Sequence, residues 1–194
     1  MIKIDYIVNS FFNSTTWILS TKENNQVWLI DCGDSKTIIE YINNNNLKLQ
    51  GIFLTHTHFD HIYGLNDLLV EYPDMIIYTS EYGKQSLYSD KMNLSCYHEN
   101  SFTYNGSNVK ILQEGDRIPI LDELYLNVIE TPGHCPSCLT YYIDSYIFTG
   151  DSYIPGIKVV TTLPKGNKQL ANNSIKKIQN LALNKKIYPG HSLP

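Results

Sequence analysis

The chain has 194 residues, a formal net charge of −4 at pH 7 and a sequence pI near 5.8. This length is enough for one domain with a substantial core and is short for two, so we expect a single domain over residues 1–194. The Lys and Arg residues are scattered along an acidic chain. Nucleic-acid binding needs a basic face, so we expect no nucleic-acid partner.

The apolar segments are too short or too interrupted for secretion or membrane insertion. Lys3, Asp5 and Asn9 break the apolar run at the N-terminus, and no later segment approaches 18 consecutive apolar residues. Four cysteines are too few for a disulfide scaffold in a chain of this size, so we expect reduced thiols. These features predict a cytoplasmic protein without a membrane partner.

The first half of the chain alternates predicted strands with helices. Aromatic and β-branched runs separated by Asn and Ser predict an antiparallel meander with strands at residues 2–8, 15–20 and 26–31. Apolar residues near helical spacing then predict a helix over 35–46, which ends in a run of asparagines. The compact apolar run at 51–55 predicts a buried strand.

The second half continues this alternation. A predicted helix over 64–72 stops before a proline, and a strand follows at 75–80. The polar stretch 81–107 contains no predicted element. The remaining predicted elements are strands at 109–113 and 124–131, a hairpin over 138–150 that turns at Asp144 and Ser145, a helix over 167–182 and a last strand at 186–190. Two sheet halves, each flanked by helices, is the simplest arrangement of this order.

Half of the six histidines lie in one short motif, T-H-T-H-F-D-H, at the end of the predicted strand 51–55. His56 and His58 are two positions apart at a strand end, so their side chains leave the same face and can bind one ion. Asp60 and His61 lie where the chain bends towards the next helix and can reach a second position. Imidazole and carboxylate together suit zinc, iron or manganese, so the motif predicts a metal site.

Three further stretches each place a potential ligand at the end of a predicted strand. His134 follows Pro-Gly in "ETPGHCPS", Asp151 follows Gly150 in "IFTGDS", and His191 follows Pro-Gly in "YPGHS". Glycine before a ligand lets the backbone turn tightly and approach an ion closely. The remaining histidine, His98, lies in the polar stretch and is expected to be a solvated loop residue.

In order and spacing, these motifs resemble those of the metallo-β-lactamase-fold hydrolase superfamily. "THTHFDH", "TPGH", "FTGDS" and "YPGH" match its metal motifs, and "LIDCG" matches its early aspartate motif, so the resemblance covers nearly the whole chain. It implies an α+β fold, the four-layer αββα sandwich. It also implies these roles: His56, His58 and His134 on one metal, Asp60, His61 and His191 on a second, Asp151 as the bridge, and Asp31 as a buried residue that orients ligands.

The function that this resemblance implies is hydrolysis at a pair of metal ions, two Zn²⁺, with iron or manganese as other possibilities. A metal-bridging hydroxide would attack an activated carbonyl, so neither Ser nor Cys is needed as nucleophile. Asp60 and Asp151 would be catalytic as well as metal ligands. Within the superfamily the chain is most similar to small hydroxyacylglutathione hydrolase-like (second glyoxalase-like) members. The sequence ends three residues after His191, so we expect no helical glutathione-binding domain.

Two other functions stay open at this point. A persulfide dioxygenase-like oxidoreductase with a single iron would use the same scaffold. Cys135 and Cys138 form a C-x-x-C, which can be a redox pair or half of a zinc site and would suit a non-catalytic metal or redox sensor. The complete set of seven ligands favours the hydrolase. We therefore expect the two cysteines to be packing residues beside His134.

Substrate specificity is expected to come from loops around the metals, because a metal site open at the strand ends has no preference of its own. The candidate loops are 81–107 and 152–170, with Tyr63 and Tyr153 as flanking aromatic residues. Small acyl thioesters and lactones are the expected substrates, because their leaving groups need no strong acid. β-Lactams are expected to react poorly, because their leaving nitrogen must be protonated.

Overall fold

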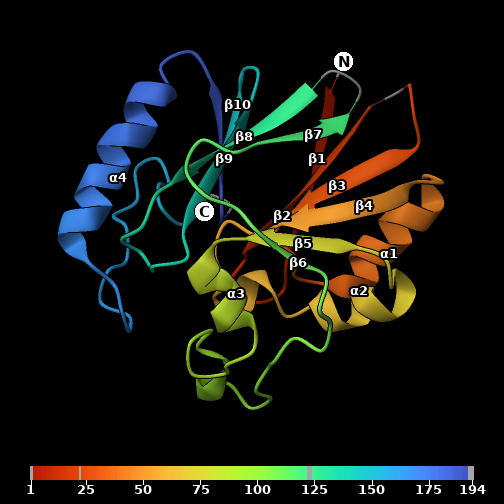
Figure 1. Cartoon of the computed structure of the whole chain (residues 1–194), viewed down its shortest axis with the longest axis horizontal. Helices are drawn as coiled ribbons and strands as arrows, with labels where there is room; N and C mark the ends of the chain where they lie inside the picture. Colours follow the sequence, from red (N-terminus) through yellow and green to blue (C-terminus); the bar gives the residue numbers. More distant parts are fainter. Residues whose placement is uncertain (1, 22, 122–123, 192–194) are drawn as a thin grey trace.

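The computed structural model describes residues 2–21, 23–121 and 124–191, whose strands form two sheets (Figure 1). The six-stranded sheet has the order β1-β2-β3-β4-β5-β6, and the five-stranded sheet has the order β11-β10-β9-β8-β7. The strands are β1 (Ile2–Val8), β2 (Thr15–Thr21), β3 (Gln26–Ile30), β4 (Lys48–Phe53), β5 (Ile76–Thr79), β6 (Val109–Ile111), β7 (Arg117–Leu121), β8 (Leu124–Glu130), β9 (Leu139–Ile143), β10 (Tyr146–Gly150) and β11 (Lys186–Pro189).

Helices cover the outer faces of both sheets. The first sheet is covered by α1 (Ser35–Asn44), α2 (Leu65–Glu71) and α3 (Glu81–Leu87). On the opposite outer side, α4 (Lys168–Leu181) lies against the second sheet (Figure 1). These four layers are the αββα sandwich, so the predicted α+β fold class is confirmed.

Alternating side chains of the central strands divide the core into two parts. In β3, Leu29 faces the helices, whereas Trp28 and Ile30 face the second sheet. This is the period of two that an extended strand imposes. In the core between the sheets, Phe53 of β4 packs against Tyr141 of β9, with ring centroids 5.5 Å apart. Each central strand is therefore buried on both faces.

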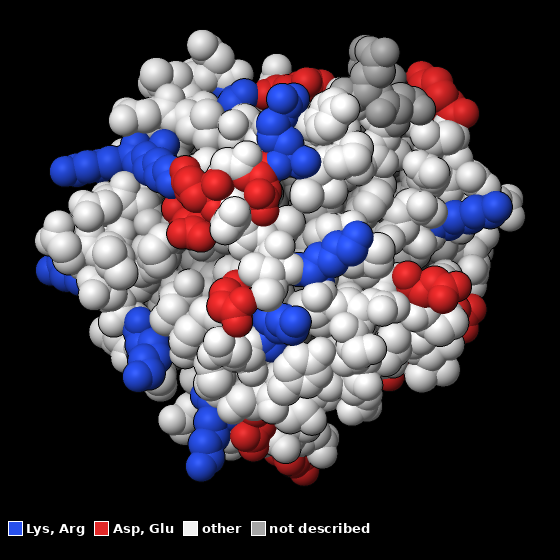
Figure 2. All heavy atoms as spheres, viewed as in Figure 1, with Lys and Arg blue, Asp and Glu red and all other residues white. Residues whose placement is uncertain are grey.

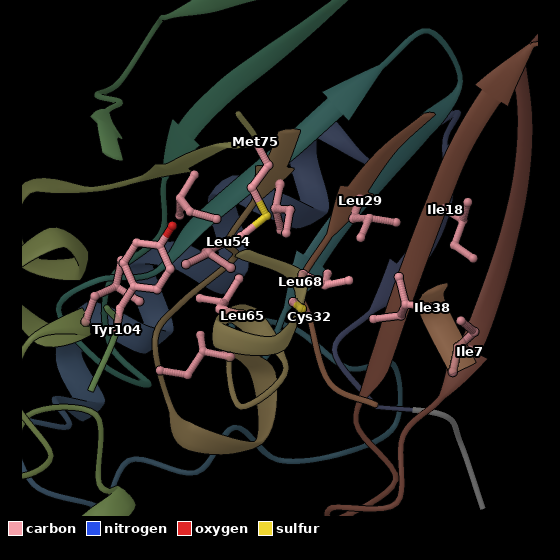
Figure 3. Close-up of a cluster of buried hydrophobic side chains, with 14 of the residues drawn as sticks. Ile7, Ile18, Leu29, Cys32, Ile38, Leu54, Leu65, Leu68, Met75 and Tyr104 are labelled. Carbon is pink, nitrogen blue, oxygen red and sulfur yellow. The ribbon is translucent and has the colours of Figure 1, made fainter. Parts of the chain in front are cut away.

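The helix-side core lies directly behind the histidine motif. Figure 3 shows Leu65 and Leu68 of α2 gathered near Leu29 of β3 and Leu54, the residue after β4, with Ile38 of α1 nearby. All five side chains are fully buried. Burying each stabilises the fold by about 1.5–3 kcal/mol relative to an exposed position. The packing of α2 thus anchors the C-terminal end of the segment that carries the motif.

The sequence analysis does not predict β7 or α3. β7 contains Pro119, which argues against a strand, but β7 is the edge of its sheet, where proline is tolerated. α3 is mostly polar and contains Gly83, which lowers helix propensity. Its N-terminus is capped by Ser80, whose Oγ accepts a hydrogen bond of 3.1 Å from the Gly83 N–H. The expectation that the polar stretch contains no element is therefore wrong for residues 81–87.

Charged side chains of both signs are interspersed on the surface. On the face in Figure 2, small groups of Lys and Arg alternate with small groups of Asp and Glu, separated by uncharged areas. The part of this face that the structure describes therefore has no broad basic patch. None of the helices in the described ranges combines the length and the apolar character that crossing a membrane requires.

Candidate metal centre

The seven predicted ligands come together from four separate segments of the chain. Three groups of three residues offer ligand atoms that lie within 4.8 Å of one another, and one of them joins Asp31 to His56 and His61. The other two contain only predicted ligands: His56, His58 and His134 in the first, and Asp60, His61 and His191 in the second. Asp151 lies between these two groups. Its Oδ2 is 3.6 Å from His134 Nε2 and 3.3 Å from His191 Nε2, and its Oδ1 is 3.6 Å from His61 Nε2.

Parallel strand pairing explains why residues so distant in sequence meet. β10 and β11 run parallel, with Gly150 paired to Pro189, so Asp151 and His191 leave the same end of the sheet. β3 and β4 are also parallel, with their last residues paired, which brings Asp31 close to the start of the histidine motif. Ligands at carboxyl ends of neighbouring parallel strands are therefore adjacent without long connecting loops.

Two glycines give the backbone the room that this convergence needs. A Cβ on Gly190 would lie 2.2 Å from Asp151 Oδ1 and 3.0 Å from His61 Cε1. Gly150 has a φ of +50°, and a Cβ there would lie 2.5 Å from Thr55 Oγ1. Only glycine fits at both positions. Glycine is therefore required at both positions by the close packing around Asp151, His61 and Thr55.

Most of the histidine rings are oriented by acceptors outside the centre. Three of them donate from Nδ1 to a backbone carbonyl or a carboxylate, so their Nε2 atoms are the potential ligand atoms. The acceptors are Val160 O for His134 at 2.8 Å, Phe12 O for His191 at 3.0 Å, and Asp31 Oδ2 for His61 at 2.9 Å. His58 has the opposite orientation, because its Nδ1 faces the centre, 2.9 Å from His134 Nε2.

Two buried polar atoms of the centre have no hydrogen-bond partner among the described residues, namely His56 Nε2 and Asp151 Oδ1. The Thr55 hydroxyl donates to Asp31, so His56 donates from Nδ1 to Thr55 Oγ1 and its Nε2 is a bare acceptor. A buried polar atom without a partner costs about 1–3 kcal/mol. Bound cations would remove that cost. Imidazole nitrogens and carboxylates are a donor set that fits zinc, iron or manganese.

Asp31 fixes the positions of Thr55 and His61 through hydrogen bonds. Its carboxylate accepts hydrogen bonds from the Thr55 N–H and the Thr55 hydroxyl, both 2.7 Å, and from His61 Nδ1. The residue is buried and has a φ of +62°, a left-handed conformation that costs energy in a residue other than glycine. These bonds engage both carboxylate oxygens, so Asp31 orients His61, the role that the sequence resemblance implies.

The charges of the centre shift its protonation equilibria in the metal-free protein. Burial alone would lower the pKa of His61, but the carboxylates of Asp60, Asp31 and Asp151 together raise that pKa to about 10. Burial and the neighbouring His61 charge lower the pKa of His56 well below its usual 6.5. Burial opposes ionisation of Asp151, yet its hydrogen bond to His191 and the nearby histidine charges hold its pKa well below the usual value.

We expect metal binding at neutral pH to release a proton from His61. A cation must displace that proton, so apparent metal affinity should fall about tenfold per pH unit below the raised pKa. Titration calorimetry in buffers of different ionisation enthalpy measures this release. A binding enthalpy that does not change with the buffer would contradict it. Without metal, the stabilisation from His61 is complete below pH 6.5 and is lost as the pH rises through about 10.

A pocket of about 400 Å³ opens onto the centre, and its walls are mainly apolar. Besides the proposed ligands, four segments line it. They contribute Phe12 of the β1–β2 turn, Phe59 of the histidine motif, three residues of the stretch after α3 (Leu94, Tyr97 and His98), and Val160 and Leu163 after β10. The backbone is left-handed at Phe12, with a φ of +52°, and at Leu94, with a φ of +66°. Such conformations are unusual for bulky residues and concentrate at binding sites.

His98 is not the solvated loop residue that the sequence predicts. Its ring stacks on Phe59, with centroids 4.7 Å apart and an interplanar angle of 28°, and meets Phe11 edge-on at 5.4 Å. A lone histidine in a polar stretch has no local signal for such a position. Conversely, neither Tyr63 nor Tyr153 is among the residues found to line the pocket, although both were predicted to flank the site.

The two cysteines of the C-x-x-C lie directly behind the ligand His134. Both are buried, their sulfur atoms are 3.3 Å apart, and a tight turn at residues 136–137 joins them. The other two cysteines are elsewhere: Cys32 is in the helix-side core, and Cys96 is exposed. Within the described chain, no potential metal-binding group includes a cysteine. The arrangement therefore gives no support to the alternative of half a zinc site.

Comparison with known proteins agrees with the fold and the centre. A family profile described as "Metallo-beta-lactamase superfamily" matches residues 9–191. The chain therefore belongs to the metallo-beta-lactamase superfamily, as its motifs predict.

Two curated relatives are similar over most of this chain. A hydroxyacylglutathione hydrolase of Pseudoalteromonas translucida is 28% identical over 184 residues, which is 95% of this chain and 63% of that protein. Glyoxylase B2 of Dictyostelium discoideum is 32% identical over 166 residues, which is 83% of this chain and 56% of that protein. The chain thus spans roughly 60% of the length of these relatives.

Among solved structures, the BLEG-1 B3 metallo-beta-lactamase superposes with a TM-score of 0.89 at 24% sequence identity. The match covers 100% of this chain and 92% of that one. At this level of identity, the likeness shows a shared fold, and the substrate must be inferred from the site itself.

Proposed function

We propose that this protein is a binuclear metal-dependent hydrolase that acts on an activated carbonyl, namely a small acyl thioester or lactone. The observation that carries the proposal is the convergence of seven ligand side chains at a pocket, with His56 Nε2 and Asp151 Oδ1 buried and unpartnered. When bound, two divalent cations such as Zn²⁺ supply a nucleophilic water at neutral pH and polarise the carbonyl. The name hydroxyacylglutathione hydrolase of a relative supports a thioester.

The positions of the two groups support the proposed ligand assignment. Asp151 would hold both cations, because its two oxygens face both groups at 3.3–3.6 Å. The remaining ligands are His56, His58 and His134 for one cation, and Asp60, His61 and His191 for the other.

Asp60 has a second role in this proposal. Its Oδ2 is 3.4 Å from both His61 Nε2 and His191 Nε2, and it lines the pocket from which substrate approaches. The carboxylate can therefore accept a proton from the attacking water and orient its lone pair. A thiol has a pKa near 8.5, so a thiolate leaves without prior protonation. The amine nitrogen of an opened β-lactam requires a proton donor.

The pocket walls favour an uncharged, apolar acyl group. No Lys or Arg of the described ranges lines the pocket, and Lys158, Lys165 and Lys168 of the neighbouring loop are exposed. The carboxylates of glutathione would find no counter-charge here. About 400 Å³ is the size of a small-molecule site, and its apolar residues would bury an acyl chain or aromatic ring next to the metals.

The test is a metal analysis and a substrate panel on protein purified without chelator. We expect two metal ions per chain, turnover of neutral acyl thioesters or lactones, and values of kcat/KM at least about 100-fold lower for penicillins and cephalosporins. Leu163→Glu should raise KM for apolar acyl substrates, whereas the exposed Leu183→Glu should not. Efficient β-lactam turnover with inert thioesters would contradict the proposal. A single iron with oxygen consumption on a persulfide would favour the dioxygenase alternative.

A further inference from the structure

The two cysteines of the C-x-x-C are placed so that they can form a disulfide. Cys135 and Cys138 are the first and last residues of a tight turn whose central residues are Pro136 and Ser137. The ends of such a turn lie within the Cα separation that a disulfide requires. The sulfur atoms are already 3.3 Å apart, so bonding at about 2.05 Å needs a shift of little more than 1 Å in total.

This turn contacts the metal-binding loops in two ways. Cys135 directly follows the proposed ligand His134 in the chain. The Ser137 hydroxyl is 3.0 Å from Cys135 Sγ and accepts hydrogen bonds from the Thr57 N–H at 3.3 Å and the Thr57 hydroxyl at 3.1 Å. Thr57 stands between two proposed ligands. A movement of Cys135 therefore reaches His134 through the chain and the motif through Ser137.

A second, small cavity reaches Cys138 from outside the main pocket. It measures about 140 Å³ and is lined by Cys138 together with Ser80, Tyr82, Pro132 and Pro136. This space admits an oxidant of two heavy atoms and excludes a tripeptide disulfide such as oxidised glutathione. Both cysteines are otherwise buried, so the cavity selects a small oxidant.

We propose that Cys135 and Cys138 are a modification site, at which hydrogen peroxide forms a reversible disulfide that weakens metal binding at the neighbouring centre. One sulfur attacks a peroxide oxygen, the O–O bond breaks, and its proton leaves with the other oxygen as water. The second sulfur then displaces the hydroxyl of the sulfenic acid, which takes the second proton and leaves as water. The two thiols lose two electrons, and one peroxide becomes two waters.

The effect on metal binding follows from the contacts of Cys135. Disulfide formation draws the Cys135 sulfur towards Cys138 and away from its partner Ser137, and so disturbs the hydrogen bonds that Ser137 accepts from Thr57 beside His58. Disturbing the residues that position a metal ligand typically reduces metal affinity about 10–100-fold. This step rests on the proposed ligand roles of His58 and His134. The chemistry of the dithiol itself does not.

The experiment compares the Cys96→Ser protein, which lacks the exposed thiol, with Cys96→Ser/Cys138→Ala. Both are reduced, loaded with zinc and treated with hydrogen peroxide. Alkylation under denaturing conditions followed by mass spectrometry counts free thiols, and a chelator competition measures metal affinity. We expect the first protein to lose two thiols and to bind zinc at least about 10-fold more weakly, with both changes reversed by dithiothreitol. The Cys96→Ser/Cys138→Ala variant should keep both its free thiols and its affinity for zinc.

The outcomes separate the two proposals. Three free thiols that persist in peroxide-treated Cys96→Ser protein would overturn the dithiol site whatever the metal does. A disulfide that forms without any change in zinc affinity would overturn its coupling to the centre. Failure of zinc to bind even the reduced protein would count against the metal assignment instead, while the thiol count still judges the disulfide. Cys138→Ser replaces Cys138→Ala if the latter does not fold.

Discussion

Asp151→Ala is expected to lose metal and to reduce hydrolysis by more than about 100-fold. That factor is the largest typical effect of changing a residue that only hydrogen-bonds to a metal ligand, whereas Asp151 is a proposed ligand itself. The carboxylate faces both groups of ligands, with Oδ2 3.3 Å from His191 Nε2 and 3.6 Å from His134 Nε2. Without it, five imidazoles and one carboxylate remain, and nothing joins the two positions. Elemental analysis should find fewer than two ions per chain.

The fold should survive this substitution, because Asp151 lines the pocket outside both hydrophobic cores and its Oδ1 has no partner among the described residues. Asp74→Ala, at an exposed position before β5, is the matched control and should keep both metal and activity. If wild type and Asp151→Ala held the same two ions per chain, Asp151 would not be the bridging ligand.

Asp31→Ala is expected to lower the free energy of unfolding of the metal-free protein by about 3–5 kcal/mol. The substitution removes the acceptor of three buried hydrogen bonds, from the Thr55 N–H, the Thr55 hydroxyl and His61 Nδ1. It also leaves alanine in a left-handed conformation, with a φ of +62°. Urea unfolding in the presence of a chelator measures the change.

Asp67→Asn provides the control for Asp31. Asp67 is exposed and accepts one hydrogen bond of 2.6 Å from the Ser35 hydroxyl, so its substitution should change stability by less than about 0.5 kcal/mol. Asp31→Asn keeps the shape and tolerates the positive φ, but it places an amide where a carboxylate accepts three donors. A loss below about 1 kcal/mol in Asp31→Ala would show that the buried carboxylate is not what holds His61.

Much of the fold is readable from local patterns. The meander β1-β2-β3, the hairpin β9-β10 and α4 are predicted within a few residues, because alternation, turn residues and helical spacing are all present in the segment itself. α3 and β7 are not, because each carries a residue that disfavours its element in isolation. Gly83 is needed in α3 because a Cβ there would lie only 2.1 Å from the Thr79 hydroxyl. Pro119 is tolerated because β7 is an edge strand.

The sequence by itself predicted the seven residues that the structure brings together, since all seven stand in short motifs at strand ends, and parallel pairing places Asp151 beside His191. Only the tertiary structure decided what surrounds them. Phe12 and His98 enter the pocket from segments without any motif, and the turn that carries Cys135 contacts the histidine motif through a serine about 80 positions away. Such contacts depend on how loops fold over a finished sheet, and no local pattern of spacing or polarity encodes that packing.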